Sequence, residues 1–347
     1  MRQLDLTLDH YKVIPKVELH RHLEGSLRLS TLQEVARTYH LDLPETGRLQ
    51  PLVQVSQEEP YSASNFLSKF ATLRQFFCSP EIIQRLAFEA IADAAMDNIR
   101  YIELRFTPAA LSKVEDFPLG DVMDWVIAGV NQAKSELDIA VSLIVSVNRH
   151  ESVDLAEKVV DLAIARLPMG ITGIDLAGDE ARYPAKPFAG VIQEARQGGL
   201  HITIHAGEWA GVANVTEAIE LLGAERIGHG IRVLENPSTV ALARERGTVY
   251  EVCMTSNYQS GVVSTLKSHP LPRLLFTGLK TTLNTDDPSI CQIMLSHEYQ
   301  LVCEVLGMPR NVLFGLIQTG AHAAFLPETK RTTLEQTLEK ELASLPD

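Results

Sequence analysis

The sequence is poor in cysteine, and its cysteines do not form the pattern of a disulfide framework. The four cysteines stand far apart and form no CxxC pair: Cys78, Cys253, Cys291 and Cys303. Small secreted domains depend on even-numbered sets of cysteines that pair with one another. The lack of such a set favours a soluble protein in the reducing environment of the cytoplasm.

Long apolar runs and an excess of basic residues are also missing. The N-terminal MRQLDLTLDHYKVIPK has no apolar signal-peptide core. The longest apolar-rich strand candidate, residues 139–147, is far shorter than the roughly 20 residues of a membrane-spanning helix. The formal net charge is −13, whereas nucleic acids and anionic membranes bind basic patches. We therefore expect neither as a partner, and no sequence pattern predicts an oligomeric state.

Nucleotide-binding and linker patterns are absent too. The chain has no P-loop, no GxGxxG and no HxE plus PCxxC signature of the cytidine-type zinc deaminases. No Ser/Gly-rich linker, low-complexity stretch or solenoid-type repeat divides it. Hydrophobic residues make up 45%, which is enough for a large core. We predict one domain over residues 1–347.

What the sequence does contain is a regular alternation of strand and helix patterns. Eight strands alternating with helices predict an α/β fold, a (β/α)8 TIM barrel. Several of the predicted strands are near-continuous apolar runs, as expected for strands buried on both faces. The predicted strands are residues 17–22, 101–106, 140–147, 173–176, 202–205, 226–229, 249–252 and 281–284. The predicted helices are residues 29–39, 81–97, 122–136, 153–165, 189–197, 215–222 and 237–246.

Two segments exceed a minimal barrel. Residues 41–77 form an insertion after the first strand–helix unit and end in a segment rich in apolar and aromatic residues. This pattern suits either a lid over the barrel mouth or an amphipathic helix packed on the barrel side. Residues 312–345 predict extra C-terminal helices that close the barrel.

Four short motifs lie at the ends of predicted strands that are far apart in the sequence. They are His20-Arg21-His22, His205-Ala206-Gly207-Glu208, Gly228-His229-Gly230 and Thr285-Asp286-Asp287-Pro288. The C-terminal ends of parallel barrel strands all meet at one mouth. The motifs therefore predict a single site built from both ends of the chain.

Three histidines and an aspartate in these motifs suit one zinc ion. His20 and His22 lie at i and i+2 of a strand and so point to the same face, while His205 ends a strand and Asp286 follows one. A single buried histidine is commonly structural, as we expect for His201. The sequence Asp-Asp-Pro is also common in turns, which is the alternative interpretation of Asp286 and Asp287. Convergence at one mouth favours the metal site, in which iron or manganese is the alternative. Strand four ends without a metal-bridging lysine, which favours one metal per chain.

The remaining polar residues suit proton transfer. Glu208, placed beside a cation and apolar walls, is a candidate acid or base. His229 is either a fourth imidazole ligand or the group that orients the attacking water. We prefer the second role because four protein ligands are already present and a catalytic zinc needs room for water. With Asp287 facing the substrate, the set describes a metal-assisted hydrolase.

Longer segments around the motifs carry a resemblance to a known family. They extend from about residue 15 to residue 328 and are PKVELHRHLEGSLR, RYIELRFTP, GIDLAGDE, HITIHAGEWAG, GAERIGHGIR, TSNYQSG, LNTDDP and FLPE. In order and spacing they resemble the adenosine deaminase family of the amidohydrolase barrels. HAGE, GHG and TDDP are specific in combination, whereas HxH alone occurs in many hydrolases.

The resemblance implies a zinc-dependent hydrolysis of adenosine and 2′-deoxyadenosine to the inosine products and ammonia. It implies one zinc per chain, held by His20, His22, His205 and Asp286. It implies that Glu208 protonates purine N1, that His229 orients the attacking water, and that Asp287 contacts that water and purine N7. The implied substrate contacts are His22, Glu24, Asp287 and the backbone of Gly178, so the expected partner is a small purine nucleoside.

One departure from the family pattern affects the substrate. Familiar adenosine deaminases have HxHLDG, but this chain has Glu24 where their aspartate lies near the ribose 5′-hydroxyl. The extra methylene moves the carboxylate by about 1.5 Å. Alternative substrates are therefore a 5′-substituted adenosine, such as 5′-methylthioadenosine or aminodeoxyfutalosine, and then free adenine. More distant alternatives are another metal-dependent barrel hydrolase and a non-catalytic purine-binding protein.

Overall fold

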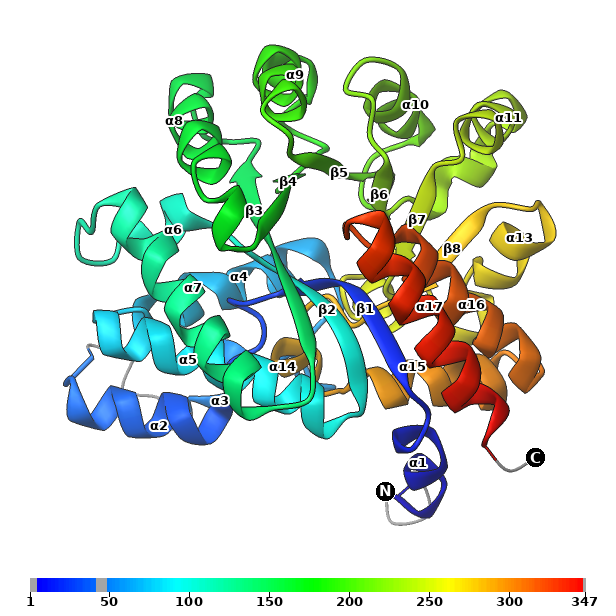
Figure 1. The fold of residues 1–347 in the computed structure, drawn as a ribbon, viewed down its shortest axis with the longest axis horizontal. Coiled ribbons are helices and arrows are strands. Elements are labelled where there is room, and N and C mark those ends of the chain that lie inside the picture. The colour runs from blue at the N-terminus through cyan, green and yellow to red at the C-terminus, as the bar shows by residue number, and fades with distance from the viewer. Residues whose placement is uncertain (1–4, 42–48, 346–347) are drawn as a thin grey trace.

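A parallel β-barrel forms the centre of the computed structural model, which describes residues 5–41 and 49–345. Within these residues, eight strands lie in the order β1 to β8, and each pairs in parallel with the next (Figure 1). The strands are β1 (Lys16–His22), β2 (Ile99–Phe106), β3 (Ala140–Asn148), β4 (Ile171–Ala177), β5 (His201–Ala206), β6 (Arg226–His229), β7 (Val249–Val252) and β8 (Lys280–Leu283). The predicted (β/α)8 fold is confirmed.

The barrel closes where its first and last strands meet. Arg21 and Asp286 form a parallel bridge just beyond the end of β8. The His22 amide donates to the Asp286 carbonyl at 2.8 Å, and the Asp286 amide donates to the His20 carbonyl at 3.0 Å. Backbone pairing therefore brings the first and last sequence motifs together.

Helices surround the barrel, and those that alternate with the strands match the predicted ones closely. These are α2 (Leu29–Thr38), α5 (Pro80–Met96), α7 (Leu119–Glu136), α8 (Val153–Ile164), α9 (Ala189–Gln197), α10 (Val212–Glu220) and α11 (Pro237–Arg246). The C-terminal helices are α16 (Arg310–Ala323) and α17 (Glu328–Ala343). α16 packs against both β1 and β8, so it covers the seam of the barrel as predicted.

Several short elements were not predicted, because they are too short to show a helical period. The helices are α1 (Asp5–Lys12), α6 (Pro108–Ser112), α12 (Met254–Gln259), α13 (Leu271–Phe276), α14 (Pro288–Cys291) and α15 (Leu295–Gln300). The 3-10 turns are η2 (Leu167–Met169), η3 (Lys186–Phe188), η4 (Ile231–Glu235) and η5 (Leu266–Ser268), and η6 (Leu301–Val305) is a π-helical turn.

The predicted insertion contains α3 (Gln50–Val53), α4 (Ala63–Leu73) and η1 (Arg74–Phe76), while its residues 42–48 lie outside the described part of the chain. α4 begins after Ser62, whose hydroxyl accepts the amide of Asn65. Phe66 is buried, and together with Leu67 and Phe70 it lines a pocket at the barrel mouth. The insertion therefore supplies one wall of this pocket.

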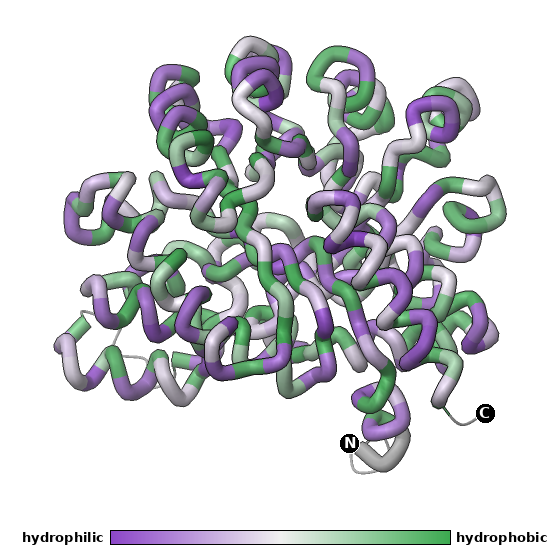
Figure 2. Tube along the Cα trace, in the orientation of Figure 1, coloured by the Kyte–Doolittle hydropathy of each residue, from purple (hydrophilic) through white to green (hydrophobic). Residues whose placement is uncertain are grey.

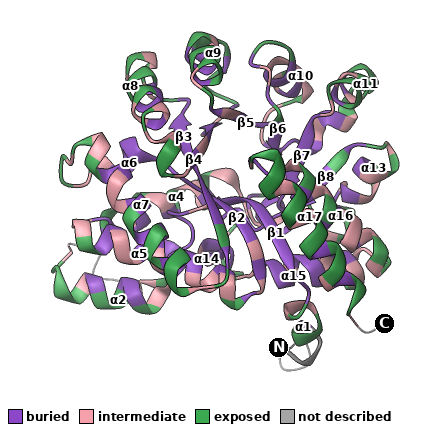
Figure 3. Cartoon of the chain, viewed as in Figure 1, coloured by how far each residue is buried: buried purple, intermediate pink, exposed green. Residues whose placement is uncertain are grey.

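The core lies between the strands and the inner faces of the helices. The strands are almost wholly buried, and exposed residues gather on the outer faces of the helices (Figure 3). Along the outer helices, hydrophobic and polar residues alternate (Figure 2). Among the described residues, no helix is both long and apolar enough to cross a membrane.

Candidate active site

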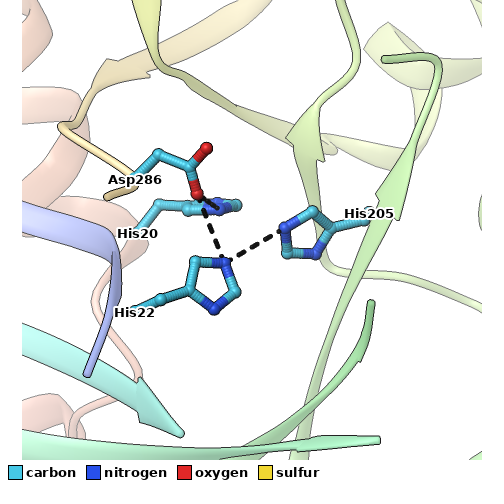
Figure 4. A group of neighbouring side chains, drawn as sticks. All are labelled: His20, His22, His205 and Asp286. Carbon is cyan, nitrogen blue, oxygen red and sulfur yellow. Dashed lines mark hydrogen bonds and ion pairs between the residues drawn. The ribbon is translucent and has the colours of Figure 1, made fainter. Parts of the chain in front are cut away.

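Four predicted ligands meet at the mouth of the barrel. His20 and His22 come from β1, His205 comes from β5, and Asp286 follows β8. Each offers one ligand atom, and these four atoms lie within 4.8 Å of one another (Figure 4). The spacing of these four atoms suits the binding of one metal ion.

The distances between ligand atoms fit a tetrahedral zinc site. His22 Nε2 lies 3.4 Å from His205 Nε2 and 3.3 Å from Asp286 Oδ1, and His20 Nε2 lies 3.1 Å from the same oxygen. Zinc bonds of about 2.0 Å place tetrahedral ligands about 3.3 Å apart. His20 Nε2 is buried and makes no hydrogen bond within the described part of the chain. The donor set and its spacing therefore fit zinc.

Carboxylates inside the barrel fix the orientation of two of these histidines. His20 Nδ1 lies 2.8 Å from Glu251 Oε2, and His205 Nδ1 lies 2.9 Å from Asp175 Oδ1. A carboxylate at Nδ1 places the ring proton there and leaves Nε2 free to bind a metal. Burial lowers the pKa of His205 to about 4, despite the opposing effect of Asp175, so this ring is neutral at neutral pH.

Arg105 on β2 joins these two carboxylates. Its guanidinium donates to Asp175 at 3.2 Å and to Glu251 at 2.9 Å, and all three side chains are fully buried. Burial opposes the ionisation of Asp175, but His205 and Arg105 hold the pKa of this carboxyl below its ordinary value. The carboxylates therefore stay charged and hold the ligand rings in place.

The two aspartates that follow β8 have opposite electrostatic environments. Burial opposes the ionisation of Asp286, but its contacts with His20 and His22 lower its pKa well below the ordinary value. Burial and the charge of Asp286 raise the pKa of Asp287. Asp287 lies so close to Gly25 that a Cβ at Gly25 would be 1.8 Å from Asp287 Oδ1, so only glycine fits there.

Glu208 lies just beyond β5, in a turn held by another carboxylate. Glu180 accepts four successive backbone amides at 2.7–3.0 Å, those of Gly207, Glu208, Trp209 and Ala210. Burial raises the pKa of Glu208 well above its ordinary value, and the charges of Asp286 and Glu180 raise it further. Glu208 is therefore suited to hold a proton in this environment and to donate it.

His229 lies beside the ligand cluster rather than within it. Its Nε2 is 3.6 Å from Glu208 Oε2 and 3.8 Å from Asp286 Oδ2, and burial lowers its pKa well below the ordinary value. Its φ of 59° is unusual for a residue other than glycine and occurs often at functional sites. A Cβ at Gly228 would lie 2.9 Å from His20 Cε1, which explains the glycine in the GHG motif.

A pocket opens above these groups. Eight of its lining residues are among the predicted site residues: His22, Glu24, Gly178, His205, Glu208, His229, Asp286 and Asp287. Glu24 Oε1 accepts the Thr107 amide at 3.1 Å, while its buried Oε2 has no hydrogen-bond partner among the described residues. Gly178 has a φ of 96°, a left-handed conformation that favours glycine, and it places bare backbone at the pocket wall. Apolar side chains of α4 cover the opposite side.

His201 lies apart from this site, as expected. It starts β5 at the other end of the strand, stacks on Phe325 at 4.4 Å and contacts Glu225 at 2.9 Å. The structure brings all the predicted site residues together and leaves this histidine outside.

Several supporting residues were missed in the sequence. Ser256 Oγ donates to Asp286 Oδ2 at 2.6 Å, and Asn257 Nδ2 contacts His229 Nδ1 at 3.0 Å. Asp175 and Glu251 could have been noticed as lone charges within apolar strands, and Glu180 as an acid after β4. Ser256 and Asn257 lie in TSNYQSG, which drew attention only through the family resemblance.

Comparisons with known proteins agree with this geometry. The adenosine deaminase family model matches residues 15–341. An adenosine deaminase of Erwinia tasmaniensis is 36% identical over 94% of this chain and 98% of its own. A zinc-bound amidohydrolase from Burkholderia ambifaria is 25% identical over 97% of this chain and 94% of its own, with a TM-score of 0.88. The N6-methyl-AMP deaminase of Arabidopsis thaliana is 26% identical over 96% of this chain and 98% of its own, with a TM-score of 0.86. The chain belongs to the adenosine deaminase family.

Proposed function

We propose that this protein is a zinc-dependent deaminase that converts adenosine and 2′-deoxyadenosine to inosine and 2′-deoxyinosine with release of ammonia. One observation carries the proposal. A four-residue metal-ligand cluster lies beside a pocket that is lined by three of its ligands and by Glu208, a carboxyl whose pKa is raised. Adenosine deaminase relatives at 36% identity support the choice of substrate.

His20, His22, His205 and Asp286 would hold one zinc ion per chain. When bound, zinc lowers the pKa of a water molecule to about 7, so that hydroxide is available at neutral pH. Asp175 and Glu251 orient the histidines for this task through Nδ1. The zinc-bound relative from Burkholderia ambifaria supports the choice of metal.

Glu208 supplies the proton that makes the purine ring electrophilic. Because burial raises its pKa, it is suited to hold a proton and to donate it to purine N1. Protonation at N1 lets C6 accept hydroxide without a build-up of negative charge on the ring. The proton of the new C6 hydroxyl then passes to the amino group, the C6–N bond breaks, ammonia leaves, and the 6-oxo purine remains.

His229 and Asp287 act on either side of the reacting carbon. His229 Nε2 faces the space between Glu208 and Asp286, where it orients the attacking oxygen. Asp287, whose pKa is raised by burial and by the charge of Asp286, is suited to hold a proton and to donate it to purine N7. The Gly178 backbone contacts the other edge of the purine, and the apolar α4 wall packs against its face.

Glu24 supports a nucleoside with a free 5′-hydroxyl as substrate. Its buried Oε2 has no partner in the described residues, so a hydroxyl donor from the substrate would satisfy it. A 5′-substituted adenosine lacks this donor, and free adenine has no ribose to supply it. These two substrates are the alternatives within the same chemistry.

We also infer that residues 1–347 act as one domain in the cytoplasm. The β-strands run from Lys16 to Leu283, and helices close the barrel behind them. All four cysteines are free, as expected in a reducing compartment.

The proposal is tested by measuring ammonia release from zinc-loaded protein with adenosine, 2′-deoxyadenosine, 5′-methylthioadenosine, aminodeoxyfutalosine and adenine. We expect the highest kcat/KM with adenosine and 2′-deoxyadenosine. Preference for a 5′-substituted nucleoside or for adenine would keep the chemistry but overturn the substrate assignment. No ammonia from any of the five would overturn the deaminase itself.

A further inference from the structure

A chain of hydrogen bonds leads away from His229 into the protein. His229 Nδ1 contacts Asn257 Nδ2 at 3.0 Å, and Asn257 Oδ1 contacts His269 Nε2 at 3.3 Å. At the far end, the backbone amide of Leu271, the first residue of α13, donates to His269 Nδ1 at 3.1 Å. His229, Asn257 and His269 are all at most 3% exposed, so the chain is closed off from solvent.

The direction of every hydrogen bond in this chain follows from its last donor. A backbone N–H can only donate, so His269 Nδ1 must be an acceptor. A neutral histidine that accepts at Nδ1 carries its proton on Nε2, and His269 therefore donates to Asn257 Oδ1. This places the Asn257 amide nitrogen toward His229 Nδ1 as a donor.

The consequence at the site is a fixed tautomer of His229. Since Nδ1 accepts from Asn257, the neutral ring carries its proton on Nε2, the atom that faces Glu208 and Asp286. His229 is then a hydrogen-bond donor toward the reacting groups and not a base. The neutrality of His269 is supported by burial, which lowers its pKa to about 3.

We propose that Asn257 and His269 are positioning residues that hold His229 as the Nε2–H tautomer, so that it donates a hydrogen bond to the attacking oxygen. The tautomer follows from the hydrogen-bond chain alone, whereas the effect on turnover rests on the proposed deaminase function. A hydrogen-bond donor aimed at a developing oxyanion raises kcat by about 10²–10³-fold. This is the largest effect on kcat that we expect from the chain of His229, Asn257 and His269, which we call the relay.

Asn257→Asp tests the direction of the relay with an isosteric change. A carboxylate has no N–H, so it accepts from His229 Nδ1 and places a proton on that nitrogen. We expect kcat for adenosine to fall about 100-fold, with KM changed less than about threefold, because the lost interaction forms in the transition state. Asn236→Asp is the matched control, since Asn236 is an exposed residue that caps α11 and takes no part in the hydrogen-bond chain, and aspartate caps equally well.

A double-mutant cycle separates positioning from general damage to the fold. If Asn257 acts through His229, Asn257→Asp has little further effect on kcat in a His229→Gln background. An equally large loss in both backgrounds would contradict the relay. His269→Phe is a second variant that leaves Asn257 free to rotate, and we expect a smaller loss of about tenfold.

The tautomer itself is read by two-bond 1H–15N spectra of protein labelled with 15N-histidine, in metal-free and zinc-loaded samples. His229→Gln assigns the resonances. We expect a protonated Nε2 and an unprotonated Nδ1 in the wild type, and a protonated Nδ1 in Asn257→Asp. A wild-type ring with its proton on Nδ1 overturns the inference, whatever the activity. The expected tautomer without deamination would instead overturn the proposed function and leave the tautomer standing.

Discussion

At the scale of single residues, a substitution of Glu208 tests the proposed proton transfer separately from metal binding. It is buried beside the ligand cluster but is not one of the four ligands. Glu208→Gln keeps the shape of the side chain and removes the proton, so we expect kcat to fall by about 10²–10⁴. Zinc content, measured by elemental analysis of the same sample, stays at one per chain. Full turnover in this variant would show that the proton comes from elsewhere.

The pH dependence of kcat/KM follows from the same group. Because the pKa of Glu208 is raised, we expect activity to decline as pH rises through that pKa and the proton is lost. On the acid side, activity declines because the attacking water is no longer ionised. The profile is therefore bell-shaped, and Glu208→Gln loses its alkaline limb. A flat wild-type profile from about pH 5 to 9 would contradict this assignment.

Seven of the site residues could be predicted because their motifs stand at strand ends and the barrel brings these ends together, whereas Glu24 and Gly178 were predicted only from the family resemblance. The polar residues behind them could not, because their roles depend on side-chain directions that a motif does not encode. Glu251 contacts His20 only because β7 presents it to the barrel interior. Asn257 supports His229 only because the short α12 turns it inward.

At the scale of elements, the turn after β5 depends on one carboxylate. Glu180 accepts four backbone amides and the side-chain amide of Asn214, and it thereby fixes the backbone that carries Glu208. In Glu180→Gln, one oxygen becomes an NH2 group that faces amide donors. Hydrogen bonds to a charged acceptor contribute about 1.5–3 kcal/mol each, so both stability and geometry suffer.

We expect Glu180→Gln to lower the midpoint of thermal unfolding and to lower kcat by about tenfold, while zinc content is unchanged. A misplacement of a reacting group by about 1 Å lowers the reaction rate by up to about 100-fold, which is the upper limit for the effect on kcat. Glu194→Gln, an exposed change on α9, is the control for the loss of one charge. Wild-type kcat in Glu180→Gln would show that the turn holds its shape without the carboxylate.

Element bounds were predictable for the short strands β6 and β7, whose bounds match the sequence prediction. The bounds of β8 were predicted less well, because the expected strand was residues 281–284 and the observed strand is Lys280–Leu283. Asn284, which follows β8, explains the error: its backbone amide still pairs with Val252 at 2.9 Å, but its side chain accepts the Leu19 amide. Tertiary contacts of this kind have no local sequence pattern.

At the scale of the whole molecule, the ligand cluster links both ends of the barrel chain. It joins β1, β5 and the segment after β8, so a bound metal ties together strands that are distant in sequence. Zinc that binds only the folded state adds about 4 kcal/mol of stability at a concentration 1,000 times its Kd. We expect a higher unfolding temperature with zinc than without it, and a slow loss of metal to chelators because the ligands are buried. Equal unfolding temperatures would contradict this role.

The central claim is that one zinc ion at the cluster of His20, His22, His205 and Asp286 enables the deamination of adenosine. The most direct measurement is a titration of metal-free protein with zinc, in which ammonia release from adenosine is followed. We expect no turnover without metal and a linear rise in turnover that saturates at one zinc per chain. Turnover that survives complete metal removal, or saturation only at two metals per chain, would contradict it.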